Sequence, residues 1–151
     1  INNIFKDCDE IWHAGDIGFN KKIEQFINQY HVKAVYGNID GRKIRAIYPK
    51  IQKFTCENVK VLMTHIGGYP NNYTKDIEKE IESFKPDLYI CGHSHILKIM
   101  YDKKYQLIHI NPGSAGKEGF HQKRTVVLLS IQNTKIHDIR VVELGPRAKL
   151  T

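Results

Sequence analysis

The sequence contains little that could form a disulfide framework, a zinc module or a membrane segment. Its three cysteines, Cys8, Cys56 and Cys91, are widely separated and form no CxxC pair. An odd number of cysteines at such spacing excludes a disulfide scaffold and a thiolate zinc module. Apolar runs stay well below the roughly 18 residues that a transmembrane helix needs, and no targeting segment stands at the start. We therefore expect a cytoplasmic protein in a reducing compartment.

Linkers, repeats and long runs of one charge are also missing. No Pro-, Gly- or Ser-rich stretch interrupts the 151 residues, a length that suits one domain. Lys and Arg outnumber Asp and Glu by 23 to 16, for a net charge of +7, yet the basic residues occur mostly in pairs. Nucleic-acid binding typically concentrates basic residues on one element, so the pattern argues against such a partner. The excess charge still favours small anionic ligands.

Hydrophobic periodicity predicts an α/β protein. Apolar positions three and four residues apart indicate two helices, one after an N-cap at Asn20 and one from about Thr74 to before Pro86. Short apolar runs bounded by turn residues predict strands at 11–14, 32–36, 51–55, 59–64, 88–91, 97–101, 106–110, 125–131 and 136–142. Because strands occur throughout and helices only in the first two thirds, we expect layered sheets covered by helices.

Four of the predicted strands end in a side chain that can bind a metal ion. Asp16, Asn38 and His93 each follow a glycine, His65 directly follows its strand, and His95 comes two residues after His93. Glycine permits the sharp turn that directs the next side chain beyond the carboxyl end of a strand. Taken singly, Gly-Asp and Gly-Asn are common turns, and a lone histidine is more often hydrogen-bonded than metal-bound. His93 and His95 are stronger candidates, because residues i and i+2 of an extended segment point the same way.

The combination is more specific than its parts. Carboxylate, amide oxygen and imidazole groups without thiolate suit Mn, Fe, Zn, Ni or Mg better than a structural zinc site. In this set and order, the sequence resembles the calcineurin-like metallophosphoesterase superfamily, and within it the small YfcE-type phosphodiesterases related to Vps29. The segments that carry the resemblance are 13–17, 36–41, 64–70, 91–95 and 111–114.

The resemblance implies a fold and a site. The fold is a four-layer α/β/β/α sandwich of two mixed sheets, with two divalent metal ions beyond the carboxyl ends of the strands. Asp16 would bridge the ions, Asn38, His65 and His93 would complete the second site, and His95 would belong to the first. Asp16, Asn38 and His65 would be the catalytic residues, with Asn38 also binding substrate. Manganese is the expected metal, with Ni, Fe, Zn and Mg as alternatives.

The same resemblance implies a reaction. Water shared by two ions about 3.5 to 4 Å apart can become hydroxide near neutral pH and attack phosphorus in line. We therefore expect hydrolysis of small phosphodiesters or phosphomonoesters. The alternative is a Vps29-like protein-interaction scaffold with an incomplete metal site. A homo-oligomer is compatible with either reading, and a membrane partner is not expected.

The sequence also departs from the family pattern. The Asp-x-His motif that completes the first metal site is absent before Asp16, and family order would place it upstream of Ile1. We therefore expect 1–151 to be a single metallophosphoesterase domain lacking its N-terminal strand, with 1–5 as the end of a helix. Ile39 stands where larger members have a histidine that protonates the leaving group. The small YfcE-type enzymes also lack this histidine, so its absence does not argue against activity. Asp40 is expected to be a turn or N-cap residue rather than a substitute acid.

The remaining histidines have no motif around them. His13 is expected to pack behind the metal ligands, and the other four are expected to be structural; they are His31, His109, His121 and His137. The segment 111–114 follows a predicted strand. It either holds a loop near the site or is a Pro-Gly turn without further function.

Overall fold

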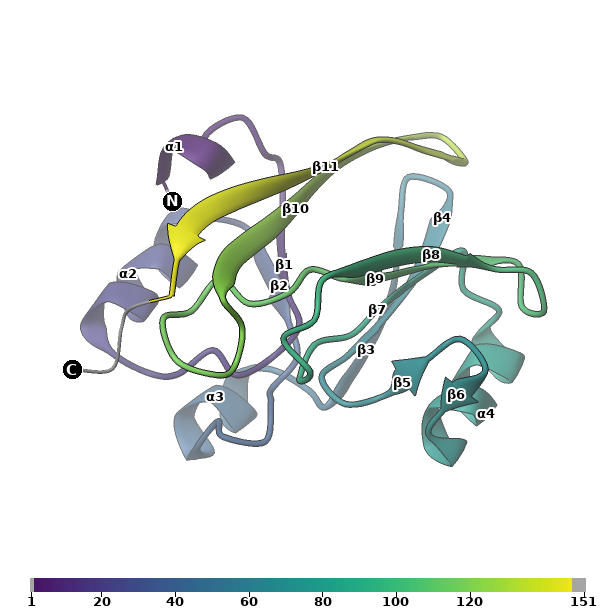
Figure 1. Cartoon of the computed structure of the whole chain (residues 1–151), viewed down its shortest axis with the longest axis horizontal. Helices are drawn as coiled ribbons and strands as arrows, with labels where there is room; N and C mark the ends of the chain where they lie inside the picture. The colour runs from purple at the N-terminus through teal and green to yellow at the C-terminus, as the bar shows by residue number, and fades with distance from the viewer. Residues whose placement is uncertain (1, 148–151) are drawn as a thin grey trace.

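A computed structural model describes residues 2–147, so Ile1 and residues 148–151 of the expected domain lie outside the described residues. Figure 1 shows the arrangement of the elements. In chain order they are α1 (Asn2–Phe5), β1 (Ile11–His13), α2 (Lys21–Gln29), β2 (Val32–Ala34), α3 (Arg42–Ile47), β3 (Ile51–Cys56), β4 (Val59–Thr64), β5 (Gly68–Tyr69), β6 (Asn72–Tyr73), α4 (Lys75–Phe84), β7 (Leu88–Ile90), β8 (Lys98–Asp102), β9 (Leu107–Asn111), β10 (Lys123–Gln132) and β11 (Lys135–Pro146).

The largest sheet has five strands in the order β3-β4-β7-β9-β8. It is mixed, because β4, β7 and β9 run parallel while β3 and β8 pair antiparallel at the two edges. Two further pairs stand apart from it within residues 2–147: β1 with β2, which are parallel, and β10 with β11, which form a long antiparallel hairpin. A short hairpin, β5–β6, precedes α4. The mixed α/β architecture predicted from the sequence is confirmed.

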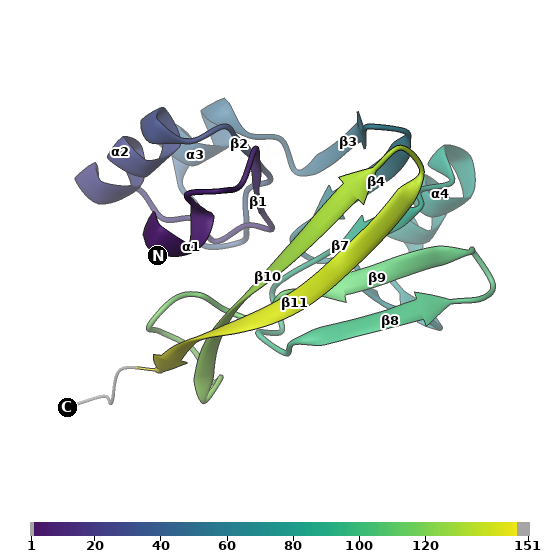
Figure 2. The same ribbon diagram turned by 90° about the horizontal axis from the view of Figure 1, so that it is seen from above.

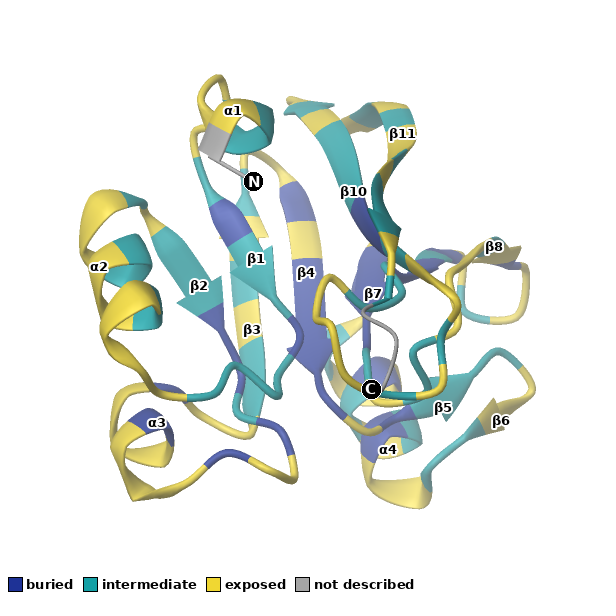
Figure 3. Cartoon of the chain, turned by 60° about the vertical axis from the view of Figure 1, so that its left-hand side comes forward, coloured by how far each residue is buried: buried dark blue, intermediate teal, exposed yellow. Residues whose placement is uncertain are grey.

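Apolar side chains on the two faces of the five-stranded sheet define the layers. On one face, Val61, Met63 and Ile90 pack against residues of the β1–β2 pair and of the β10–β11 hairpin. On the other face, Leu62 and Tyr89 pack against α4, and Figure 2 shows this helix beyond the sheet. Because β4 and β7 lie between two layers, both strands are almost wholly buried, as Figure 3 shows.

The outermost layer on the β1–β2 side consists of helices. Ala34 of β2 forms a small core with Ile44 of α3 and Tyr48, and Ile27 of α2 packs against it. The order of layers is therefore helix, strand pairs, five-stranded sheet, helix, in agreement with the expected four-layer sandwich. Within residues 2–147 the second β layer consists of two separate pairs rather than one continuous sheet.

Local signals located most elements correctly. The side chain of Asn20 accepts hydrogen bonds from the backbone N–H groups of Lys22 and Ile23 and so begins α2 as expected. Two features were not predicted from the sequence, α3 and the β5–β6 hairpin. Helix α3 has six residues and buries only Ile44, so it carries no readable period. Strands β5 and β6 have two residues each and depend on the glycine-rich loop around them.

Candidate metal centre

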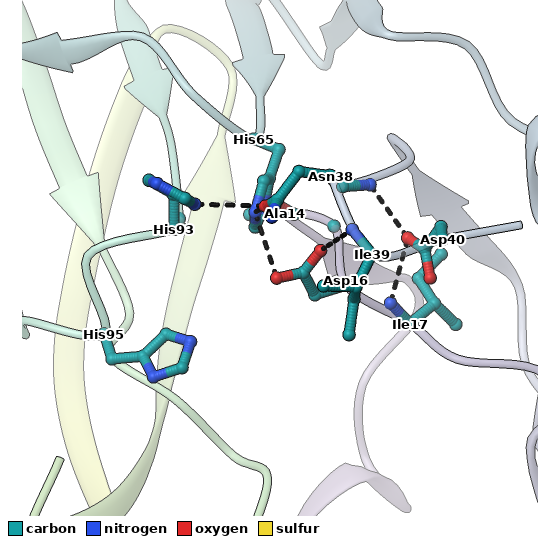
Figure 4. Close-up of polar contacts among 12 residues, drawn as sticks. Ala14, Asp16, Ile17, Asn38, Ile39, Asp40, His65, His93 and His95 are labelled. Atoms are coloured by element: carbon teal, nitrogen blue, oxygen red, sulfur yellow. Dashed lines mark hydrogen bonds and ion pairs between the residues drawn. The ribbon is translucent and has the colours of Figure 1, made fainter. Parts of the chain in front are cut away.

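The predicted ligands lie on loops that leave parallel strands at one edge of the molecule. Asp16 and Asn38 follow β1 and β2, which pair in parallel. His65 follows β4, and His93 follows β7, another parallel pair. Because the carboxyl ends of parallel strands meet at one edge, side chains distant in sequence converge there, as Figure 4 shows.

Four of the five side chains are in direct contact. The Nε2 atom of His65 lies 2.9 Å from Asn38 Oδ1 and 3.2 Å from Asp16 Oδ2. The Nδ1 atom of His93 lies 3.1 Å from the same Asn38 oxygen. These separations match those of adjacent ligands around one ion, which are about 3 Å for metal–ligand bonds of about 2.1 Å at right angles.

The protonation of His65 favours a cation among these atoms. Its Nδ1 lies 2.7 Å from the backbone oxygen of Ala14, and a carbonyl can only accept, so Nδ1 carries the hydrogen. In the neutral ring, Nε2 then has a lone pair that faces Asp16 Oδ2 and Asn38 Oδ1. Three acceptor atoms this close repel one another unless a cation or a proton lies among them. The donor set therefore fits a divalent metal ion.

This convergence depends on the amide of Asn38. Within residues 2–147, no three His, Cys, Asp or Glu side chains are arranged to hold a metal ion by themselves. The oxygen of Asn38 is the atom that both His65 and His93 contact. The candidate centre therefore combines one amide oxygen with the carboxylate of Asp16 and the imidazoles of His65 and His93.

Glycine is required where the loops approach one another. A Cβ atom at Gly37 would lie 2.0 Å from Asp16 Oδ1, and one at Gly15 would lie 2.6 Å from His65 Nδ1. Gly15 also has a φ of +99°, which residues with a side chain rarely adopt. The glycines of the strand-end motifs thus make room for the polar side chains, in addition to forming the turns.

Asp40 joins the two loops that carry Asp16 and Asn38. Its carboxylate accepts hydrogen bonds from the backbone N–H groups of Gly18 at 2.8 Å, Ile17 at 3.1 Å and Gly37 at 2.8 Å. Burial opposes ionisation of Asp40, but these hydrogen bonds outweigh it and hold the pKa of the carboxyl below its usual range. Asp40 therefore has the expected turn function and, beyond it, ties the loop after β1 to the loop after β2.

A buried asparagine holds the loop that carries His93 and His95. The amide of Asn111 donates to the backbone oxygen of Gly92 at 3.0 Å and to Ser94 Oγ at 3.1 Å, and its Oδ1 accepts from Gly113 N–H. Tyr69 hydrogen-bonds to the same Ser94 hydroxyl. Of the two readings of segment 111–114, the structure supports the one in which it holds a loop at the site.

His95 stands apart from the other four predicted ligands. The expected extended geometry of residues 93–95 is wrong: β7 ends at Ile90, and both His93 and His95 have left-handed backbone, with φ of 68° and 60°. Within the described residues, the hydrogen bond of His95 is to His121, at 3.2 Å between the two Nδ1 atoms. Burial and the nearby His121 lower the pKa of His95, while Asp16 acts in the opposite direction.

His121 is the residue that sequence reasoning missed. We expected it to be structural, but it lies against a predicted metal ligand. It occupies the loop between β9 and β10, 26 positions after His95, with no motif around it. No local signal could have identified it, because the contact depends on how that loop folds back.

The other histidines behave as expected. His13 accepts a hydrogen bond from Gly15 N–H at 3.2 Å, and burial lowers its pKa, so it packs behind the ligands as a neutral ring. His31 lies 3.7 Å from Glu10 at the surface. His137 contacts the neighbouring Asp138.

His109 lies in the middle of the large sheet, away from the ligands. It is fully buried, and its ring stacks on Tyr89 with centroids 5.2 Å apart and meets Tyr69 edge-on at 5.4 Å. Neither ring nitrogen has a hydrogen-bond partner within residues 2–147. Burial lowers the pKa of His109 to about 4, so the ring is neutral near neutral pH.

Comparison with known proteins agrees with this geometry. Residues 1–134 match the calcineurin-like phosphoesterase superfamily domain. A probable metallophosphoesterase of Methanothermobacter thermautotrophicus is 26% identical over 147 residues, which cover 96% of this chain and 81% of that protein. In the described part of the chain, no helix is long and apolar enough to cross a membrane.

Solved structures share the fold at low sequence identity. Vps29 of Chaetomium thermophilum superposes with a TM-score of 0.73 at 13% identity, covering 97% of this chain and 88% of that one. An archaeal phosphodiesterase superposes with a TM-score of 0.70 at 22% identity, covering 94% and 88%. A predicted phosphoesterase of Streptococcus pneumoniae gives 0.65 at 18% identity, covering 95% and 78%. Since the superfamily domain spans most of the chain and the fold agrees, the protein belongs to the calcineurin-like phosphoesterase superfamily.

Proposed function

We propose that the protein is a metal-dependent hydrolase of small organic phosphoesters, either diesters or monoesters, that uses two divalent ions. Membership of the superfamily supports phosphoester hydrolysis in general. The observation that carries the proposal is the convergence of Asp16, Asn38 and His65, whose acceptor atoms lie close enough to share one cation. Ions bound there would supply Lewis-acid activation of water and neutralise charge on the phosphoryl group.

The chain's own residues have distinct tasks in this proposal. Asp16 provides the one negative charge in the cluster and would bridge the two ions. His65 is held in one tautomer by Ala14, and this leaves Nε2 for the second ion, beside His93. Asn38 would bind the ion through Oδ1, and its amide N–H groups can donate to a phosphoryl oxygen of the substrate. Manganese is the first metal to test, with Ni, Fe, Zn and Mg as alternatives.

Neither of the two residues that follow Asn38 in the chain, Ile39 and Asp40, is suited to protonate a leaving group. Ile39 is apolar and 71% exposed. Asp40 is held ionised by three backbone N–H groups, so it has no proton to give near neutral pH. We therefore propose substrates with good leaving groups, whose departure does not need a general acid.

Exposed apolar side chains adjoin the proposed ligands in sequence. Ile39, Ile66 and Ile96 directly follow Asn38, His65 and His95 and are 71%, 45% and 61% exposed, and Phe120 is fully exposed beside His121. Large exposed apolar residues at a polar site favour a ligand with apolar groups. This supports an organic substituent on the phosphate and argues against nucleic acid as the substrate.

The test combines metal content with hydrolysis. Purified protein is titrated with Mn²⁺ by calorimetry, and bis-p-nitrophenyl phosphate and p-nitrophenyl phosphate are assayed with Mn²⁺ and with a chelator. We expect bound Mn²⁺ and hydrolysis that the chelator abolishes. Failure to bind any divalent ion, together with no hydrolysis of either ester, would contradict the proposal and favour the protein-interaction scaffold.

A further inference from the structure

The loop between β9 and β10 brings a second histidine to His95. The two rings are 5.0 Å apart between centroids and meet edge-on at 80°, with the Nδ1 atoms 3.2 Å apart. In Figure 4 the His95 ring extends from its loop toward Asp16. A ring nitrogen of His95 is thus in contact with His121 on one side while the ring faces the candidate metal centre on the other.

The hydrogen-bond partners determine which atoms carry the hydrogens. His121 Nε2 lies 2.9 Å from the backbone oxygen of Gly116. A carbonyl only accepts, so Nε2 of His121 carries the hydrogen, and Nδ1 of the neutral ring has the lone pair. The contact between the two Nδ1 atoms is then a hydrogen bond only if His95 donates from its own Nδ1. In that tautomer, Nε2 is the basic nitrogen of His95.

The loop is shaped to make this contact. Gly119 has a φ of +120°, and a Cβ atom there would lie 2.3 Å from His95 Nδ1 and 3.1 Å from His121 Nδ1. Only glycine lets the backbone pass so close to both rings. The backbone oxygen of Gly116 therefore fixes the acceptor side of the histidine pair, and Gly119 leaves the space that the two rings occupy.

We propose that His121 is a positioning residue for the first metal ion, because it accepts the Nδ1 hydrogen of His95 and so reserves Nε2 of His95 for that ion. The inference rests on the proposed function, since it takes His95 as a metal ligand. Histidine ligands characteristically donate their second N–H to an acceptor that fixes tautomer and orientation, and loss of that acceptor costs about 10- to 100-fold in metal affinity. Here a second histidine supplies the acceptor.

The first test needs no metal. Long-range nitrogen–proton NMR spectra of the metal-free protein report which nitrogen of His95 is protonated. We expect hydrogen on Nδ1 in the unsubstituted protein, a loss of this preference in His121→Ala, and its retention in His121→Asn, because the asparagine Oδ1 can replace Nδ1 as acceptor. Hydrogen on Nε2 of His95 in the unsubstituted protein would overturn the proposal.

The second test measures Mn²⁺ affinity by calorimetry in the same variants. We expect His121→Ala to weaken one of the bound ions about 10- to 100-fold, His121→Asn to restore most of the affinity, and the surface control His31→Ala to change nothing. Equal weakening in both His121 variants would make His121 itself a ligand and overturn the positioning role. If the unsubstituted protein binds none of Mn²⁺, Ni²⁺, Fe²⁺, Zn²⁺ and Mg²⁺, the proposed function fails, and so does the proposed effect of His121 on a bound ion. The NMR result separately decides whether His121 accepts the Nδ1 hydrogen of His95.

Discussion

At the scale of single residues, the candidate centre is built from side chains on unusual backbone. Asp16, His93 and His95 all have left-handed φ values, of 56°, 68° and 60°. Such conformations cost about 1–3 kcal/mol each for residues other than glycine and persist only where the surroundings enforce them. Because three of the five predicted ligands have this strained backbone conformation, the rest of the fold must hold them in place against the strain.

Asp16 provides the sharpest residue-scale prediction. Asp16→Asn preserves size and one acceptor oxygen but removes the negative charge that would bridge two cations. We expect at least about a 100-fold loss of phosphodiester hydrolysis and weaker binding of both ions, without a change in circular dichroism. The control is Asp138→Asn, on the exposed hairpin of β10 and β11. Full turnover by Asp16→Asn would show that the bridging assignment is wrong.

At the scale of elements, the loops at the strand ends are held by two buried polar side chains. Asp40 joins the loops after β1 and β2, and Asn111, at the end of β9, holds the loop after β7. Both bind mainly backbone groups, so they fix the path of a loop rather than one side chain. The predicted ligands are thereby positioned by hydrogen bonds that include some between residues 17 to 22 positions apart in sequence.

Asn111→Ala tests this bracing. The substitution removes two donated hydrogen bonds and one accepted hydrogen bond at a wholly buried position, so we expect the free energy of unfolding to fall by about 2–3 kcal/mol. We also expect Mn²⁺ affinity to fall about 10- to 100-fold, because the loop carrying His93 is released. Urea unfolding and calorimetry measure the two effects. Asn28→Ala, on the exposed side of α2, is the matched control; unchanged metal binding in Asn111→Ala would contradict the bracing.

At the scale of the whole molecule, four layers surround two cores on the faces of the five-stranded sheet. The basic residues behind the net charge of +7 occur mostly in pairs along the sequence rather than in one long run, which suits a small anionic substrate. The imidazole of His109 is wholly buried between the layers, and it is among the buried polar groups that have no hydrogen-bond partner in the described residues. Protonation of this buried ring changes the free energy of unfolding of the protein.

His109 predicts how that stability depends on pH. Its folded-state pKa of about 4 lies below the ordinary 6.5, so the unfolded chain binds more protons than the folded one between these values. The contribution of neutral His109 is therefore fully present above about pH 6.5 and is lost as the pH falls toward 4, by on the order of 2–3 kcal/mol.

The variant His109→Phe isolates this contribution. Because phenylalanine cannot be protonated, we expect a smaller loss of unfolding free energy between about pH 7.5 and about pH 4.5 than in the unsubstituted protein. Urea unfolding at the two pH values measures it, and His31→Ala, at an exposed position, serves as control. An identical pH dependence in His109→Phe and the unsubstituted protein would contradict the assignment.

The sequence predicted those features that arise from local patterns. Alternating and helical spacing located nearly all strands and the two longer helices, because burial of one face imposes a period on the chain. Turn glycines before polar residues indicated Asp16, Asn38 and His93, because a glycine turn at a strand end is itself local. The short helix α3 and the β5–β6 hairpin were missed, since elements of two to six residues impose no period.

The sequence by itself therefore determined which residue types stand at the strand ends and, through them, the family and its general chemistry. Only the tertiary structure decided how these side chains are held: Asp40 and Asn111 tie separate loops together, and His121 contacts His95. These partners lie between 17 and 26 positions apart in sequence. No short pattern encodes such contacts, because they exist only after the sheet and its loops have been assembled.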